Sequence, residues 1–265
     1  IFFFLLIPGV KEDKEMISRY VESVEKQKSE GTEKFFTQLK EAFSHKNFVA
    51  FILFYFLYQS CTLSMSASVD YVGDYILPGG KGETTIIFAG MLVGALISVP
   101  LWGKIALKIK SNQKALMWAA VVIIISLIPT FISQTRLHYT ISITLFGIGF
   151  GGYWFLITPC MADVIDEIVV KTKRRNDGIY MGFRAFFGRL AYAVQAASFA
   201  IVHTLTKFEN KPNHKQPLSA LFGIRLHMAG LPMIFMIIGL LIFWKMNSLN
   251  PEKMRGIHVE LKRMN

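Results

Sequence analysis

Basic residues occur at two unusual places in this sequence. Arg189 lies near the middle of a long apolar run, about 11 residues after Gly178. A crowded basic segment precedes that run and contains Lys171, Lys173, Arg174 and Arg175. An arginine at the centre of a membrane costs at least about 2.5–3.5 kcal/mol on insertion scales, so it is normally retained because it binds or pairs with something. We therefore expect Arg189 to lie on a transport pathway.

The chemistry of Arg189 favours a negatively charged partner. Its guanidinium is planar and keeps its proton in practice, which suits a bidentate contact with a carboxylate or a phosphate. Tyr192 and Gln195 follow at steps of three residues and extend a polar face along the same helix. Arg184 lies nearer the end of the run and either joins this site or only extends its charged head to the membrane surface. The alternative role for Arg189 is a structural ion pair.

Acidic residues lie next to the basic segment and near another run. Asp163 and Asp166 come before it and are expected to pair with it as a gate at a cytoplasmic mouth. The basic members of this predicted gate are Lys173, Arg174 and Arg175. Asp70 and Asp74 share one helical face, with Gln59 deeper in, and are expected at the rim of a pathway.

The composition indicates a membrane protein without a cofactor. Of the 265 residues 52% are hydrophobic and 18% are charged, whereas soluble domains have about a quarter charged. Cys61 and Cys160 lie in apolar runs and predict no disulfide. The six histidines show no metal-ligand spacing, and no catalytic constellation appears at membrane depth. We expect neither an enzyme nor a metal or cofactor site.

Six apolar runs are long enough to span a bilayer, which needs roughly 20 apolar residues. Their approximate limits are 48–69, 84–107, 113–132, 138–161, 178–204 and 218–244. Helices are expected, because lipid offers no partner to an exposed backbone amide and the alternation of a membrane barrel is absent. Buried helices of a large soluble protein are the alternative.

Glycines within these runs predict close helix contacts rather than a nucleotide site. They are Gly90 and Gly94, and the set Gly147, Gly149, Gly151 and Gly152.

The distribution of lysine and arginine predicts the orientation. One side of the six runs collects 21 of the 29 basic residues and the other side collects 5, which places the first side in the cytoplasm. The net charge of +11 follows from this topology and requires no nucleic-acid partner.

Four segments are predicted along the chain. Residues 1–9 are interpreted as the end of a truncated transmembrane helix, and 10–46 as a cytoplasmic loop. This loop contains an amphipathic helix, since Phe35, Phe36, Leu39 and Phe43 recur at helical spacing among charges,. The helix is expected to lie on the inner membrane surface and to brace two halves of a transporter, or else to bind a partner. Residues 47–246 hold the six spanning helices, and 247–265 form a cytoplasmic tail.

The stretch from Asp163 to Arg189, with the order of the spans, resembles the second half of a known transporter family. This is the glycoside–pentoside–hexuronide:cation symporter family of the major facilitator superfamily, to which the melibiose permease belongs. The resemblance implies the six-helix C-terminal bundle of a twelve-helix fold in the plasma membrane. It also implies symport of a sugar, glycoside or related solute with Na⁺ or H⁺ by alternating access. A lysine of the permease aligns with Arg189 and takes part in coupling.

The resemblance leaves several alternatives open. The cation-binding acids of the family lie mainly in the first half, which this sequence lacks, so that half is an expected partner. The change from lysine to Arg189 weakens the case for a neutral sugar. A lysolipid-type carrier of the same superfamily and a non-transporting membrane protein are the alternative functions.

Overall fold

The computed structural model describes residues 33–77, 81–209 and 216–264. These residues are almost entirely helical and include no strand. The chain divides into two compact units after Ser44, and each is described by itself. The first unit contributes α3 (Glu33–Ser44), the amphipathic helix expected from its phenylalanine spacing. The predicted end of a helix at 1–9, and the part of the loop up to residue 32, lie outside the described residues.

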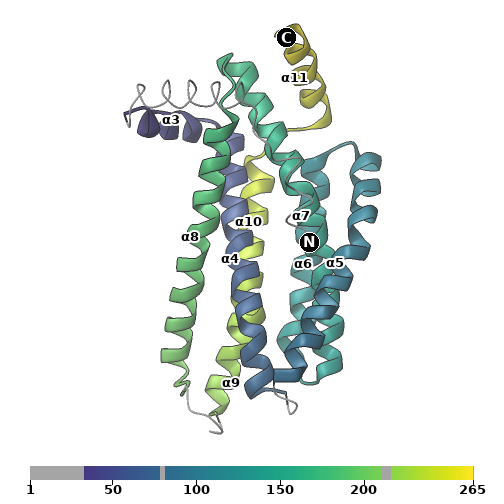
Figure 1. The fold of residues 1–265 in the computed structure, drawn as a ribbon, viewed down its shortest axis with the longest axis vertical. Coiled ribbons are helices and arrows are strands. Elements are labelled where there is room, and N and C mark those ends of the chain that lie inside the picture. Colours follow the sequence, from purple (N-terminus) through teal and green to yellow (C-terminus); the bar gives the residue numbers. More distant parts are fainter. Residues whose placement is uncertain (1–32, 78–80, 210–215, 265) are drawn as a thin grey trace, which may run out of the picture. The chain divides into compact units, whose positions relative to one another are not determined.

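The second unit contains all of the other helices that the structure describes (Figure 1). These are α4 (Lys46–Tyr75), α5 (Lys81–Ile109), α6 (Asn112–Ile132), α7 (Arg136–Thr172), α8 (Asp177–Leu205), α9 (Leu218–Arg225), the π-helical turn η2 (Leu226–Gly230), α10 (Leu231–Met246) and α11 (Pro251–Met264). Polar caps begin two of them: Ser111 Oγ accepts from Lys114 N before α6, and Thr135 Oγ1 accepts from His138 N before α7, each at 3.3 Å. Such caps satisfy amides that have no partner within the helix.

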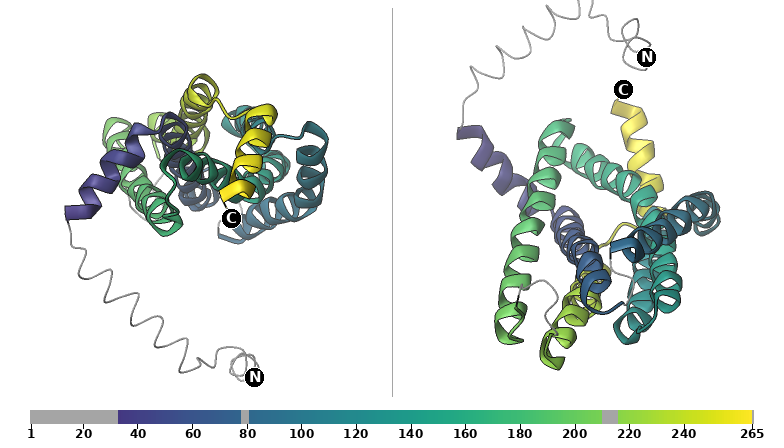
Figure 2. Two further views of the ribbon diagram at one scale, coloured as in Figure 1. Left: turned by 90° about the horizontal axis from the view of Figure 1, so that it is seen from above. Right: turned by 60° about the horizontal axis from the view of Figure 1, so that its bottom comes forward.

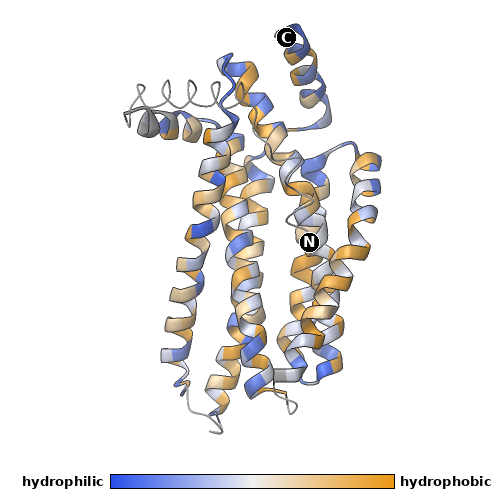
Figure 3. Cartoon of the chain, viewed as in Figure 1, coloured by the Kyte–Doolittle hydropathy of each residue, from blue (hydrophilic) through white to orange (hydrophobic). Residues whose placement is uncertain are grey.

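Six helices of this unit are long and apolar enough to cross a membrane. They are α4, α5, α6, α7, α8 and the continuous segment 218–246, which joins α9, η2 and α10. The prediction of an all-helical membrane bundle is confirmed. Figure 3 shows hydrophobic residues along the lengths of these helices. α8 is the least apolar of the six and contributes the smallest share of buried residues, so most of its surface is free of the rest of this unit.

Two groups of helices meet within the bundle (Figures 1 and 2). α7 packs most extensively against α5 and α6, while α4 packs against α10 and α8. Aromatic side chains join the groups: the ring of Phe54 on α4 stacks on Phe243 of α10, with centroids 4.9 Å apart, and meets Tyr153 of α7 edge-on at 5.4 Å. α8 is attached to the bundle mainly through α4, with further contacts to the last span at η2.

Small residues allow α5 and α7 to approach closely, as the glycine spacing predicts. A Cβ added to Gly94 of α5 would overlap the carbonyl oxygen of Thr144 on α7, and one added to Gly147 would overlap that of Met91. The backbones of the two helices thus meet without intervening side chains. In membranes such contacts replace the hydrophobic driving force that lipid cannot supply between helices.

Replacing Gly94 with alanine is expected to destabilise the bundle, because the opposing atom belongs to the backbone and cannot rotate away. Overpacking of this kind typically costs about 1–3 kcal/mol, which we expect as a lower melting temperature in detergent. Gly182→Ala on α8 is the matched control, since a Cβ there meets nothing. That control should melt at or above the wild-type temperature. A Gly94→Ala protein that melts with the control would contradict the close contact.

The structure differs from the sequence-based limits at three places. α7 continues to Thr172 instead of ending near residue 161. Its 37 residues extend roughly 55 Å, well beyond a hydrocarbon core of about 30 Å. The last span contains the π turn η2. The tail forms α11, whose buried residues Met254 and Ile257 lie on one helical face. The end of the bundle that carries α11 is called the tail end below.

Candidate functional site

Arg189 is exposed on α8 (Asp177–Leu205), as the thirteenth of 29 residues. At 1.5 Å per residue it lies roughly 18 Å along the helix, near its middle. Its guanidinium makes no hydrogen bond or ion pair with any residue that the structure describes. The face of α8 that packs on α4 carries Tyr180, Phe183 and Gly188, and Arg189 lies beside this face. Among the described residues the helix therefore presents an unpaired cation near the middle of a spanning segment.

Gly188 explains how α8 reaches α4 next to Arg189. A Cβ at this position would lie 2.9 Å from the hydroxyl oxygen of Tyr55 on α4. Arg184, one turn earlier, places its guanidinium carbon 5.1 Å from the centroid of the same tyrosine ring. This is the geometry of a cation–π contact. Arg184 thus packs toward α4, whereas the side chain of Arg189 is exposed.

The other residues predicted around Arg189 lie along α8. Tyr192 is 58% exposed, and Gln195 is half-buried. Within the described residues, neither side chain makes a hydrogen bond to another helix. Asp70 and Asp74 are exposed near the end of α4, where a rim was expected. The candidate site within these residues is therefore an open polar strip on α8 rather than an enclosed pocket.

The predicted gate residues lie at the tail end, but only some of the expected pairs between acidic and basic residues form there. Asp163 Oδ2 accepts hydrogen bonds from Asn112 Nδ2 at 3.0 Å and Gln113 Nε2 at 2.7 Å, so it holds the start of α6. A polar cavity of about 270 Å³ adjoins this carboxylate and is also lined by His258 of α11. Asp163 contacts none of the basic residues of the loop.

The remaining members of the predicted gate connect α7, α8 and α11. Arg175 lies 3.8 Å from Asp166 and 3.0 Å from Asp177, and its hydrogen bond to Asp177 raises the pKa of the guanidinium further. Lys173 Nζ lies 3.1 Å from Glu260 of α11. Lys173 also ends α7, in the left-handed conformation with φ 56°. Arg174 is exposed, and its described contacts, both with Thr172, involve only its backbone.

A model of the family described as MFS/sugar transport protein matches residues 1–248 of the chain. The chain belongs to this family. The six membrane-spanning helices and the match together make the protein a membrane transporter of the major facilitator superfamily. An exposed arginine halfway along a spanning helix is then an expected feature, since transport requires polar groups inside the membrane.

Glu167 is a buried carboxylate of the transporter that the sequence analysis did not single out. Its side chain is 3% exposed and accepts hydrogen bonds from Asn47 Nδ2 at 2.6 Å, Lys171 Nζ at 3.0 Å and Lys253 Nζ at 2.6 Å. Asn47 in turn accepts from the backbone amide of Ser248 at 2.8 Å. Only the spacing of four between Glu167 and Lys171 is visible in the sequence.

A second group missed from the sequence lies at the opposite end of the bundle. His203 of α8 and His227 of η2 face each other, with their Nε2 atoms 3.0 Å apart. His227 is completely buried. The histidine spacing in the sequence does not reveal this pair, because its members lie 24 residues apart on different helices. Among the described residues, no group of three or more histidine, cysteine or acidic side chains is placed to hold a metal ion.

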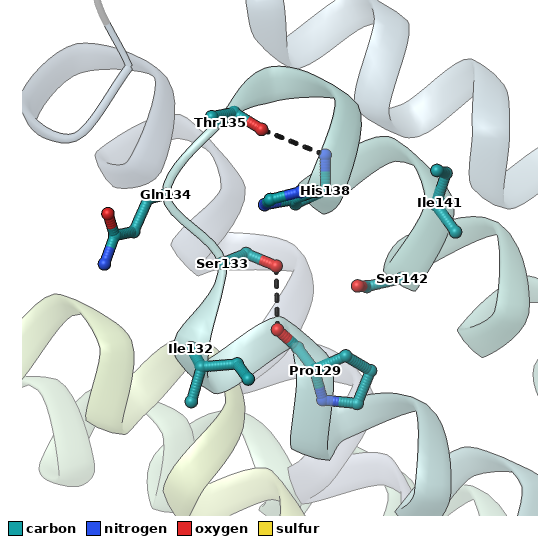
Figure 4. Close-up of a pocket in the computed structure, with 8 residues that line it drawn as sticks. All are labelled: Pro129, Ile132, Ser133, Gln134, Thr135, His138, Ile141 and Ser142. Atoms are coloured by element: carbon teal, nitrogen blue, oxygen red, sulfur yellow. Dashed lines mark hydrogen bonds between the residues drawn. The ribbon is translucent and has the colours of Figure 1, made fainter.

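A cavity of about 470 Å³ opens at the same end, between α6 and α7 (Figure 4). Its walls are mainly apolar and come from the end of α6, the turn at 133–135 and the first turns of α7. Ser133 Oγ donates to the carbonyl oxygen of Pro129 at 2.7 Å and so closes α6. None of the residues predicted to bind or couple lines this cavity, so it carries no role in the proposal below.

Proposed function

We propose that this protein is a secondary active transporter that moves a small organic solute by alternating access in symport with a cation. The observation that carries the proposal is Arg189, which is exposed and unpaired within the described bundle. Lipid is the costliest surrounding for that side chain. A water-filled pathway, in which an anionic or polyhydroxylated solute can meet the guanidinium, stabilises it instead.

The proposal includes a second six-helix bundle that packs along the exposed face of α8. Substrate sites of such transporters lie between two repeats near the middle of the membrane, the depth at which Arg189 lies. This arrangement agrees with the resemblance to the glycoside–pentoside–hexuronide:cation symporters. Tyr192 and Gln195 would then complete a polar wall on the same side of the pathway.

The charge distribution supports a cytoplasmic tail end, and the resemblance to the symporters favours the plasma membrane. The 110–114 and 171–175 regions and α11 are all rich in lysine and arginine, and short cytoplasmic connections carry such an excess. In this orientation the contacts of Arg175 and Lys173 lie at the cytoplasmic mouth. His203 and His227 lie near the outer surface.

A lysolipid-type carrier is the second candidate, and exposed apolar residues beside Arg189 favour it. Phe186 is 61% exposed and Leu190 is 42% exposed. A cation flanked by apolar side chains matches the phosphate and the acyl chain of a lysolipid. The two candidates differ in the chemistry of the solute and in the need for an ion gradient.

The deciding experiment measures uptake by the complete polypeptide reconstituted in vesicles. Labelled sugars, glycosides, organic anions and lysolipids are offered with and without a sodium or proton gradient. Gradient-driven accumulation of one small polar solute supports the symporter. Lysolipid uptake supports the second candidate, and the absence of any uptake in vesicles that hold folded protein contradicts both.

The gate proposed at the tail end also has a test. Exposed ion pairs contribute only about 0–1 kcal/mol each, so replacing Lys173, Arg174 and Arg175 with glutamine should leave the fold intact but loosen the closed mouth. We expect faster labelling of a cysteine introduced at Met181, which is exposed one turn into α8.

The matched control for the gate removes three charges from the same end. It replaces Lys104, Lys108 and Lys110 with glutamine, because these residues are exposed and form no ion pair in the described structure. The control should label at the wild-type rate. Equal labelling rates in all three proteins would contradict a gate formed by the 173–175 segment.

A further inference from the structure

Two histidines form a hydrogen-bonded pair where three spanning segments meet. His203 lies in the last turn of α8, and His227 lies in η2, which belongs to the last span. Ser68 of α4 completes the group, with its Oγ 2.7 Å from His227 Nδ1. π-helical turns such as η2 are rare and occur frequently at functional sites. The group therefore ties α4, α8 and the last span together near one end of the bundle.

One assignment of the protons satisfies all three hydrogen bonds of the neutral pair. Ser68 Oγ donates to the carbonyl oxygen of Ser64 at 2.5 Å, so its hydrogen is already used. Ser68 Oγ must then accept from His227 Nδ1–H, which leaves His227 Nε2 as an acceptor. His203 consequently donates through its Nε2–H, and its Nδ1 is left with a lone pair.

This arrangement allows the pair to take up one proton without losing a hydrogen bond. A proton added to His203 Nδ1 makes that ring cationic, and its Nε2–H still donates to His227. The bond becomes charge-assisted and stronger. A second proton would have to occupy His227 Nε2, where it would oppose the Nε2–H of His203 and break the bond. The geometry thus favours a single added proton shared by the pair.

Aromatic rings surround the pair. Phe208 stacks on His203 with centroids 4.3 Å apart, and Phe199 stacks on His227 at 4.1 Å. Tyr71 of α4 lies 5.1 Å from His203 and 5.5 Å from His227. Ring faces at these distances stabilise a cation, so they favour the protonated His203. Because His203 is half-buried and His227 completely buried, the outer ring is the one that a proton reaches from water.

No carboxylate in the described structure hydrogen-bonds to either ring. On α4, Tyr71 faces both rings, whereas Tyr75 contacts the rings of Tyr71 and Phe208. The acidic residues of that helix are exposed. Arg225 lies two residues before His227, beside Tyr139 of α7. Lys207 follows α8 and is exposed. The ionisable residues of α6 and α10, Lys114 and Lys245, lie at the tail end of the bundle. The histidines are therefore the ionisable side chains at this end of the described bundle whose ordinary pKa lies closest to neutral pH.

We propose that His203 and His227 together form a binding site for one proton, and that a proton bound there drives or gates transport. The first half of this inference stands on the geometry of the pair alone. The second half rests on the proposed transport function. Binding would hold α8 against the last span through the strengthened bond, and release of the proton would weaken that contact when the helices rearrange.

The first test reads proton binding without transport. The complete protein is labelled with ¹⁵N-histidine, placed in lipid nanodiscs and titrated by NMR. We expect a ¹⁵N–¹⁵N coupling across the bond between the two Nε2 atoms and the uptake of one proton by the pair. His227→Gln should shift the titration midpoint of His203 by about 1 pH unit or more, as expected for strongly coupled sites.

An exposed histidine at the same end of the bundle provides the control for this test. His138→Gln removes an exposed histidine at the same end and should leave the titration of the pair unchanged. Two rings that titrate independently, or that take up no proton, would overturn the proposal. The coupling in the wild-type protein and the His203→Gln variant give the answer even where His227→Gln does not fold.

The second test links the site to transport. Uptake by wild-type protein should rise roughly fivefold or more when the medium on the side of the pair is acidified, within the usual range of coupling between two sites. His203→Gln should abolish this rise yet retain exchange of solute without a gradient, and His138→Gln should behave as wild type. A variant that keeps the full rise would overturn the role in transport. Absence of any uptake by the wild type would contradict the proposed function and leave the titration result standing.

Discussion

Replacing Arg189 with alanine is expected to lower the initial rate of uptake by roughly 30-fold to 5,000-fold. Loss of a desolvated charge that contacts a bound solute costs about 2–5 kcal/mol, and each 1.36 kcal/mol is a factor of ten. The protein should remain folded, because Arg189 is exposed and makes no contact that holds the described bundle together. Uptake is measured in vesicles, and size-exclusion chromatography reports folding.

The lysine variant separates charge from geometry. Arg189→Lys keeps the positive charge, but its ammonium group cannot form the bidentate contact of a guanidinium. Partial uptake by this variant therefore indicates that charge alone contributes, whereas loss as complete as in the alanine variant indicates that the planar fork is required.

Arg263→Ala is the matched control for these variants, because Arg263 is an exposed arginine of α11 outside the spanning helices. It should transport at the wild-type rate. Full uptake by Arg189→Ala would remove Arg189 from the mechanism. A variant that no longer elutes as folded protein would instead assign it the structural ion pair that the sequence also allows.

Much of the fold follows from the sequence because each spanning helix satisfies its own backbone. A long apolar run in lipid has one stable form, so the existence of α4, α5, α6 and α8 required no knowledge of their neighbours. The ends were harder to predict. α7 continues past residue 161 because Asp163 and Glu167 are satisfied by α4, α6 and the tail. The turn η2 has no signal in the hydropathy pattern.

Some functional residues are visible in the sequence, and others depend on how the helices pack. Arg189 is visible in the sequence because a charge within an apolar run is anomalous on its own. The two distant partners of Glu167 are not visible in the sequence, since Asn47 is 120 residues away and Lys253 is 86 residues away. The histidine pair likewise depends on how α8 crosses the last span. Such pairings are properties of the packed bundle, and no local spacing encodes them.

Replacing Glu167 with alanine is expected to give the largest loss of stability among the variants considered. The carboxylate is 3% exposed and joins α4, α7 and α11 through three donors. Its removal leaves Lys171 and Lys253 facing one another and deprives the buried amide of Asn47 of a partner. Breaking a buried ion pair costs about 3–5 kcal/mol. We expect a loss at the lower end of this range, because the two lysines are 52% and 38% exposed and regain water.

A loss of this size corresponds to a fall in melting temperature of about 10 °C for a protein of this length. It can be measured by tryptophan fluorescence during heating in detergent. Glu260→Ala is the matched control: this glutamate also pairs with a lysine, Lys173, but its side chain is 50% exposed. The control should fall by only a few degrees, since exposed pairs contribute about 1 kcal/mol or less. Equal falls in the two variants would contradict the assignment of Glu167 as a buried junction.

The glutamine variant distinguishes the charge of Glu167 from its hydrogen bonds. Glu167→Gln keeps an oxygen that can accept from Asn47 but removes the negative charge that neutralises Lys171 and Lys253. If the charge dominates, the variant should melt close to Glu167→Ala, and added salt should narrow its difference from wild type by screening the two lysines. If the hydrogen bond to Asn47 dominates, it should melt close to wild type. We expect the first result, because two of the three donors to this carboxylate are cationic and hydrogen bonds between charged groups are the stronger ones.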